Sequence, residues 1–136
     1  MAHPAIHGAT GGWTAADAER WLVSLEPFGM RFRLDRMRLL MTALGSPQRS
    51  FAAIHVVGTN GKSSTVRMTA AILEAHGVRT GAYLSPHLVS FAERIRVGGQ
   101  DISGARFAAA AARAHRAAAV VDRELPAGDR VTQFEA

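Results

Sequence analysis

The sequence predicts an α/β fold built around one strand–loop–helix unit, and three observations lead to this prediction. Residues 51–57 form a short apolar run of the kind that makes a buried strand. Gly61, Lys62 and several hydroxyl residues follow, before a helical pattern that continues to His76. Residues 79–84, which follow the glycine at the end of that helix, then read as a second strand. Because a helix joins the two predicted strands, we expect them to be parallel and connected by a right-handed crossover.

The loop between the first strand and the helix has the features of a phosphate-binding site. Gly58 and Gly61 allow the backbone to turn with positive φ and to approach an anion closely. The N–H groups of the first helical turn point toward such an anion. Lys62, the only lysine in the chain, adds a compact positive charge. A hydroxyl from Ser63 or Ser64 is suited to bind the magnesium ion that accompanies a nucleotide.

Two helices are predicted before this unit. Thr14 and Asp17 form a capping box, and a helix follows to about Leu25. Its apolar face comprises Ala18, Trp21, Leu22 and Leu25. Asp35 is expected to cap a second helix over 36–44, with Met37, Leu40, Met41 and Leu44 facing inward.

A polar loop, a hairpin and a long helix are predicted after the unit. The polar loop covers residues 85–94 and includes His87, and we expect Glu93 and Arg94 to pair and hold it. The glycine pair at 98–99 predicts a small hairpin over 94–102. An alanine-rich helix over 104–125 follows, with its apolar side formed by Phe107, Ala111, Ala114, Ala118 and Val121.

The last residues suggest that the chain is a fragment. Thr132-Gln-Phe-Glu135 is a capping-box pattern, which announces a helix where the sequence stops. Residues 1–12 have no periodicity and are expected to form a flexible tail, which leaves 13–136 as at most one domain.

Composition excludes several classes of function. The net charge of +5 suits anionic ligands such as nucleotides, but the arginines are scattered, which argues against nucleic acid. The absence of cysteine excludes disulfides and thiolate metal sites and fits a cytoplasmic protein. No apolar run reaches the ~18 residues of a membrane helix, and no signal-peptide pattern begins the chain.

The phosphate loop departs from the standard pattern in a way that resembles one superfamily. The standard pattern places a glycine at position 56, where this chain has valine. Residues 58–64, Gly-Thr-Asn-Gly-Lys-Ser-Ser, resemble the shortened phosphate loop of the Mur ligase superfamily. Further stretches resemble the folylpolyglutamate synthase / dihydrofolate synthase family, in order and at similar spacing: 29–36, 39–47, 54–62, 85–88, 93–97 and 132–135. The resemblance covers about residues 18–136.

This resemblance implies a fold, an activity and partners. The fold is a Mur-ligase-like, P-loop-containing central domain with a three-layer, mostly parallel sheet, of which residues 13–136 are the N-terminal part. The activity is an ATP-dependent ligation that adds L-glutamate to folates, to dihydropteroate or to both, through an acyl phosphate. The implied cofactors are ATP and Mg²⁺, and the full-length enzyme is expected to be monomeric. The family's further metal ligands and its glutamate-binding domain lie downstream, so we expect this fragment alone to lack ligase activity.

The resemblance also implies roles for individual residues. Lys62 is the catalytic residue, through its charge on the transferred phosphoryl group. The implied magnesium ligand is Ser85, with Ser63 and Ser64 as the other hydroxyl candidates. Thr132 and Phe134 match positions that contact the pterin, where an aromatic ring can stack on the heterocycle. The residues implied to bind ATP are Gly58, Thr59, Asn60, Gly61, Lys62, Ser63 and Ser64.

Two positions depart from the family's pattern, and two other functions are open. Ser63 replaces the usual glycine after the lysine, where it either crowds the phosphate or supplies a ligand of its own. Gln133 stands where the family often has an aromatic residue. The alternatives are a Mur ligase of peptidoglycan synthesis and a non-catalytic P-loop module that only binds nucleotide.

Overall fold

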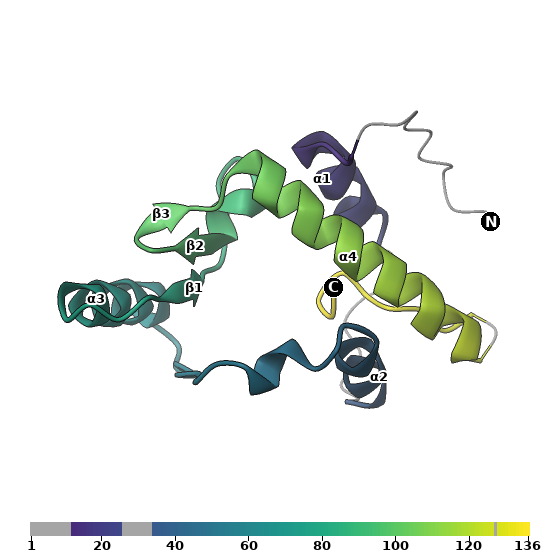
Figure 1. Ribbon diagram of the computed structural model, residues 1–136, viewed down its shortest axis with the longest axis horizontal. Helices are drawn as coiled ribbons and strands as arrows, with labels where there is room; N and C mark the ends of the chain where they lie inside the picture. The colour runs from purple at the N-terminus through teal and green to yellow at the C-terminus, as the bar shows by residue number, and fades with distance from the viewer. Residues whose placement is uncertain (1–11, 26–33, 127) are drawn as a thin grey trace. The chain divides into compact units, whose positions relative to one another are not determined.

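The computed structural model describes residues 12–25, 34–126 and 128–136 (Figure 1). It divides into two compact units. The first comprises Met1–Ala52 and Ala105–Ala136, and the second comprises Ala53–Gly104. The tail predicted for residues 1–12 lies outside the described residues, apart from residue 12.

Helices make up most of the first unit. They are α1 (Ala15–Ser24), α2 (Asp35–Ala43) and α4, which spans Gly104–Glu124 and begins at the last residue of the second unit. A short 3-10 helix, Pro47–Arg49, follows α2. The ranges of α1, α2 and α4 lie close to those that the sequence predicts, whereas the 3-10 helix was not predicted.

The starts of α1 and α2 differ in how they are capped. The capping box predicted for α1 is confirmed, because Thr14 N donates to Asp17 Oδ2 at 2.8 Å and Asp17 N donates to Thr14 Oγ1 at 3.2 Å. The capping role predicted for Asp35 is wrong. Leu34 already has helical backbone angles and occupies the N-cap position, so the helix geometry begins one residue earlier and Asp35 becomes its first residue. There its carboxylate still faces the positive end of the helix dipole.

The core of the first unit lies between α1 and α4. The four apolar residues predicted to face inward on α1 are all buried. On α4 the prediction holds for Phe107, Ala111, Ala118 and Val121, whereas Ala114 is half-exposed. The ring of His115 lies 5.0 Å from that of Trp13 and 5.3 Å from that of Trp21, which joins the two helices. Within residues 35–43, the buried side chains are Leu40 and, unexpectedly, Arg36.

The second unit combines one helix with one small sheet. Helix α3 (Lys62–Ala75) packs beside β1 (Gly81–Tyr83), as Figure 1 shows. A short 3-10 helix, Phe91–Arg94, leads into β2 (Ile95–Val97) and β3 (Gln100–Asp101). The sheet order is β1-β2-β3, and both pairings are antiparallel. The hairpin predicted over 94–102 is therefore confirmed.

The described sheet does not contain the parallel strand pair predicted for 51–57 and 79–84. Residues 51–57 form no strand, and β1 pairs instead with β2, with Gly81 opposite Val97 and Tyr83 opposite Ile95. A strand forms only when its N–H and C=O groups find a partner strand, and no strand in the described residues pairs with 51–57. The α/β class holds, but the described sheet is antiparallel rather than part of a three-layer parallel core.

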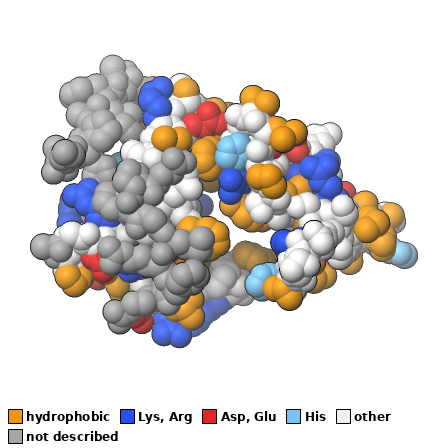
Figure 2. Space-filling model, turned by 180° about the vertical axis from the view of Figure 1, so that it is seen from behind, with side chains coloured by type: hydrophobic (Ala, Val, Ile, Leu, Met, Phe, Trp, Pro, Cys, Tyr) orange, Lys and Arg blue, Asp and Glu red, His pale blue; other side chains and the backbone are white. Residues whose placement is uncertain are grey.

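The second unit buries little apolar surface. Leu84 is its one buried hydrophobic residue, and all residues from 53 to 104 are described. Ile54 and Val57 are 67% and 76% exposed, and Met68 and Ile72 of α3 are exposed as well. Figure 2 shows one face of the molecule, on which hydrophobic side chains reach the surface in several places. None of the helices in the described parts of the chain has the length and apolar character needed to cross a membrane.

Candidate nucleotide-binding loop

The predicted phosphate loop leads directly into α3. Gly58 has a φ of 151° and Gly61 a φ of 73°, a region that glycine adopts far more readily than other residues. Gly61 is the N-cap of α3, and no side chain caps the helix there. The N–H groups of Lys62, Ser63 and Ser64 therefore lie in the first helical turn, where an anion is favoured by the helix dipole.

The ammonium group of Lys62 lies against the backbone of its own loop. Nζ donates to the carbonyl oxygen of Gly58 at 2.6 Å and to that of Thr59 at 3.1 Å. Thr65 also ties the loop to the helix, because its Oγ1 donates to the carbonyl of Gly61 at 3.0 Å. The lysine side chain thus folds back onto the backbone of residues 58–59.

Ser63 and Ser85, two of the predicted magnesium ligands, are joined by a hydrogen bond. Ser63 Oγ donates to the carbonyl oxygen of Ser85 at 3.0 Å. The bond connects the predicted phosphate loop to the loop that follows β1, so the two loops are adjacent. The serine that replaces the family's glycine therefore has a structural role here. Ser64 lies beside Ser63 in the same turn and is exposed.

The loop after Ser85 is held by Glu93 through backbone N–H groups. The Glu93 carboxylate accepts from the N–H groups of Leu88 and Val89, each at 2.9 Å, and from that of Ser90 at 2.8 Å. These hydrogen bonds, that of Leu88 first, lower the pKa of Glu93 below its usual value of 4.5 because they favour the ionised form. The carboxylate acts as a fixed anchor for residues 88–90.

Arg94 has different partners, so the expected pairing of Glu93 with Arg94 is wrong. Arg94 Nε donates to Nδ1 of His87 at 2.7 Å, and its guanidinium lies 5.2 Å from the centre of the Phe91 ring. The His87 ring also contacts Phe91, with 4.4 Å between the ring centres. His87 thus has structural contacts within the loop.

The two residues predicted to contact a pterin lie in the first unit and differ sharply in exposure. Thr132 is 1% exposed, and its N–H and its hydroxyl both donate to Glu135 Oε2 at 2.9 Å. Phe134 is 77% exposed. Both belong to a turn over residues 132–135, in which Glu135 N donates to the carbonyl of Thr132 at 3.1 Å. Phe134 is therefore the one of the two that an approaching ligand would meet.

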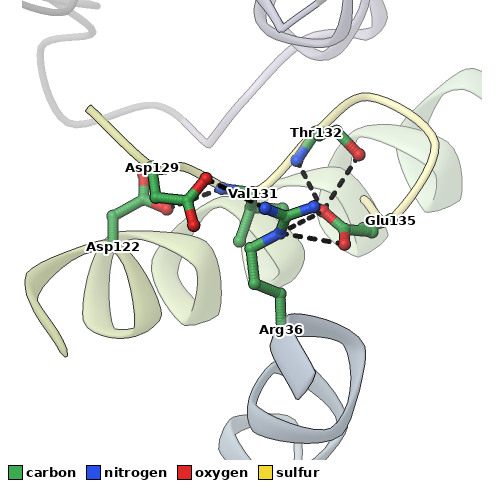
Figure 3. Close-up of polar contacts among 6 residues, drawn as sticks. All are labelled: Arg36, Asp122, Asp129, Val131, Thr132 and Glu135. Atoms are coloured by element: carbon green, nitrogen blue, oxygen red, sulfur yellow. Dashed lines mark hydrogen bonds and ion pairs between the residues drawn. The ribbon is translucent and has the colours of Figure 1, made fainter. Parts of the chain in front are cut away.

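Arg36 is a buried charged residue that the sequence did not single out. Its guanidinium is buried against the carboxylates of Glu135 and Asp129, as Figure 3 shows. The sequence holds one signal for it, because Arg36 lies four residues before the buried Leu40 and so shares its helix face. An arginine on an apolar face predicts a buried acidic partner, but not which one.

Comparison with known proteins agrees with the family resemblance of the sequence motifs, although no family model matches the chain. The chain is 42% identical over 107 residues to the dihydrofolate synthase/folylpolyglutamate synthase of Mycobacterium tuberculosis, covering 75% of this chain and 22% of that protein. It is also 42% identical over 87 residues to the Bacillus subtilis protein of the same name, covering 64% of this chain and 20% of that protein. The chain thus spans about a fifth of the length of these curated relatives.

Solved structures give the same result. The folylpolyglutamate synthase of Mycobacterium tuberculosis, complexed with ADP, superposes with a TM-score of 0.80 at 38% identity, covering 89% of this chain and 27% of that one. A folylpolyglutamate synthase complex with AMPPCP and folate gives a TM-score of 0.78 at 32% identity, covering 90% and 30%. By sequence and by structure, the chain belongs to the folylpolyglutamate synthase / dihydrofolate synthase family.

Proposed function

We propose that this chain supplies the nucleotide-binding part of an ATP-dependent ligase that adds L-glutamate to folates, to dihydropteroate or to both, through an acyl phosphate. The observation that carries the proposal is the loop that holds Lys62 at the uncapped N-terminus of α3. The names of the relatives support folate chemistry, and two similar structures were solved with ADP or with AMPPCP and folate. These names favour the proposal over a Mur ligase of peptidoglycan synthesis.

The loop residues suit the phosphates of ATP. Gly58, Thr59, Asn60 and Gly61 provide backbone that can surround an anion, and the first turn of α3 provides N–H donors. Lys62 would exchange its two carbonyl contacts for phosphate oxygens, and its charge would then offset the charge that develops on the transferred phosphoryl group. Lys62 is therefore the proposed catalytic residue.

The hydroxyl groups suit Mg²⁺. This hard cation prefers oxygen ligands and is often held by few protein groups together with water and phosphate oxygens. Because Ser63 Oγ gives its proton to the Ser85 carbonyl, its lone pairs remain available to a cation. Ser64 and the side chain of Ser85 are the other candidates. The described residues contain no cluster of three or more His, Cys, Asp or Glu side chains that could hold a metal instead.

The pterin site and the fold belong to the same proposal. The exposed Phe134 would stack on the pterin, and Thr132 would support it. Residues 51–57 would form a strand of a three-layer, mostly parallel sheet when partner strands are present, which fits the exposure of Ile54 and Val57. The complete ligase would act as a monomer in the cytoplasm on small molecules, without nucleic-acid or membrane partners.

Nucleotide binding by the chain tests the proposal. Titration calorimetry with AMPPCP and Mg²⁺ should detect binding, and Lys62→Met should weaken it by about tenfold or more, because a charge-assisted contact to phosphate is lost. Arg67→Met is the matched control, since it removes one positive charge from an exposed position of the same helix. Equal losses from both variants, or no binding by the unaltered chain, would refute the nucleotide site.

A ligase assay separates catalysis from binding. The polypeptide extended to the length of its relatives should join radiolabelled glutamate to tetrahydrofolate or dihydropteroate. AMPPCP binding with no ligation in the extended protein would instead favour a non-catalytic nucleotide-binding module.

A further inference from the structure

A buried arginine of α2 contacts the turn over residues 132–135. Arg36 Nε donates to Oε1 and Oε2 of Glu135 at 3.0 and 3.2 Å, across 99 residues of sequence. Its Nη1 donates to Oδ1 of Asp129 at 3.0 Å. Figure 3 shows the guanidinium rising from α2 and lying between the two carboxylates. The Arg36 side chain therefore holds both ends of the segment 129–135, which includes the turn.

Further hydrogen bonds hold the same segment. Glu135 Oε2, already bound to Arg36, accepts from the N–H and the hydroxyl of Thr132. Val131 N donates to Oδ1 of Asp122 on α4 at 2.8 Å, and Val131 is fully buried. The turn is thus fixed to two helices, to α4 through Asp122 and to α2 through Arg36.

Phe134 is the exposed residue of this fixed turn. Arg36, Val131, Thr132 and Glu135 are buried, whereas the Phe134 ring stands in solvent. Turning a large aromatic ring toward water forgoes the burial that usually stabilises it. The buried arginine also leaves its Nη2 without a hydrogen-bond partner in the described part of the chain. Stability alone is a poor explanation of this arrangement, because well-packed apolar residues often stabilise a core as well as a buried ion pair does.

We propose that Arg36 is a positioning residue, which holds the 132–135 turn so that Phe134 presents its ring in one orientation to a planar heteroaromatic ligand. This inference rests on the proposed function for the identity of the ligand, a pterin. Stacking depends on the orientation of the Phe134 ring. Because the turn is already ordered before the pterin arrives, binding does not incur the entropy cost of ordering it. The planar fork of arginine is needed because it reaches Glu135 and Asp129 together, whereas lysine offers only a single point charge.

The order of the turn is the first test, and it needs no ligand. In ¹⁵N relaxation measurements, the amides of residues 132–135 should have order parameters near ~0.85 in the unaltered chain and below ~0.6 in Arg36→Met. Arg38→Met is the matched control, since it removes the same charge from an exposed position of α2 and should leave the turn unchanged. If Arg36→Met does not fold, Arg36→Lys and Glu135→Gln report on the same link. A turn that stays ordered in the folded variants overturns the inference.

Ligand binding is the second test, with pteroic acid as the probe. Arg36→Met should weaken pteroate binding by about tenfold, and this loss should vanish in a Phe134→Ala background, because Arg36 acts through that ring. Arg36→Lys should not restore affinity. An Arg36 effect that persists without Phe134 overturns the positioning role.

The results that would overturn the proposed pterin contact differ from those that would overturn the positioning role of Arg36. Unchanged pteroate affinity in Phe134→Ala, or no binding by the unaltered chain, overturns the pterin contact and the ligand half of this inference. The relaxation measurement then still decides whether Arg36 orders the turn.

Discussion

Ser63 Oγ donates a hydrogen bond of 3.0 Å to the carbonyl oxygen of Ser85, 22 residues further along the chain. This bond joins the loop at the start of α3 to the loop after β1. The sequence leaves two readings of Ser63, as a group that crowds a phosphate or as a ligand in its own right. The structure adds a third role, because Ser63 ties together the two loops that carry the proposed magnesium ligands.

Loss of this bond should loosen the proposed metal site. Ser63→Ala leaves the Ser85 carbonyl without its donor, at a cost of about 1 kcal/mol. We expect Mg²⁺-dependent AMPPCP affinity, measured by calorimetry, to fall by about fivefold. Ser50→Ala is the control, since it removes a comparable bond, from Ser50 Oγ to the Pro47 carbonyl, outside the second unit. Stronger binding by Ser63→Ala would show instead that Ser63 crowds the phosphate.

The loop at residues 88–90 should loosen in acid. Hydrogen bonds from Leu88 and Ser90 lower the pKa of Glu93 below 4.5 in the folded chain. A lowered pKa means that the ionised form stabilises the fold, so this contribution is present above pH 4.5 and is lost as the pH falls through the folded pKa. NMR titration should show the amides of residues 88–90 shifting together below pH 4.5.

Glu93→Gln supplies the comparison for this titration. The carboxamide has one acceptor oxygen and does not ionise, so the acid transition at residues 88–90 should disappear. If the same transition persists in Glu93→Gln, another group controls the loop.

The second unit should be far less protected than the first. It buries Leu84 and little else, whereas the first unit has a core between α1 and α4. Segments with few buried apolar contacts open at low free energy. In hydrogen-exchange mass spectrometry, peptides from α3 and β1–β3 should exchange about 100-fold faster than peptides from α4. Because α4 serves as the internal reference in the same sample, equal protection would contradict this prediction directly.

The ion pair between Arg36 and Glu135 should show strong coupling in stability. Arg36→Met leaves a buried carboxylate without its cation and should cost about 3 kcal/mol in denaturant unfolding followed by circular dichroism. Adding Glu135→Gln removes that buried charge while keeping an acceptor for Thr132, so the double variant should recover about half of the loss. Arg38→Met should stay within about 0.5 kcal/mol of the unaltered chain. Additive losses from Arg36→Met and Glu135→Gln would show that the two side chains are not coupled.

Local patterns predicted the elements that depend on neighbouring residues. The capping box at Thr14 and Asp17, the hairpin around residues 98–99 and the buried face of α1 all follow from spacings of two to four residues. The phosphate loop belongs to the same class, because glycine φ angles and a helix N-terminus are local properties. The family membership also followed from short motifs in a fixed order.

Features that need a distant partner could not be predicted in this way. Residues 51–57 have the composition of a strand, but a strand exists only where another strand accepts its hydrogen bonds, and β1 takes β2 as its partner. The pairing of Arg36 with Glu135 could not be predicted for the same reason. The sequence places a charge on a buried helix face, but it does not show that the partner is a carboxylate 99 residues away.

The sequence by itself determined the glycine turn before α3, the helices and the family to which this chain belongs, because each depends on residues close together in the chain. Only the tertiary structure decided that Ser63 binds Ser85, that Glu93 holds three backbone N–H groups, and that Arg36 fixes the turn from which Phe134 projects. The physical reason is that hydrogen bonds and buried ion pairs depend on distance in space, which a linear pattern does not specify.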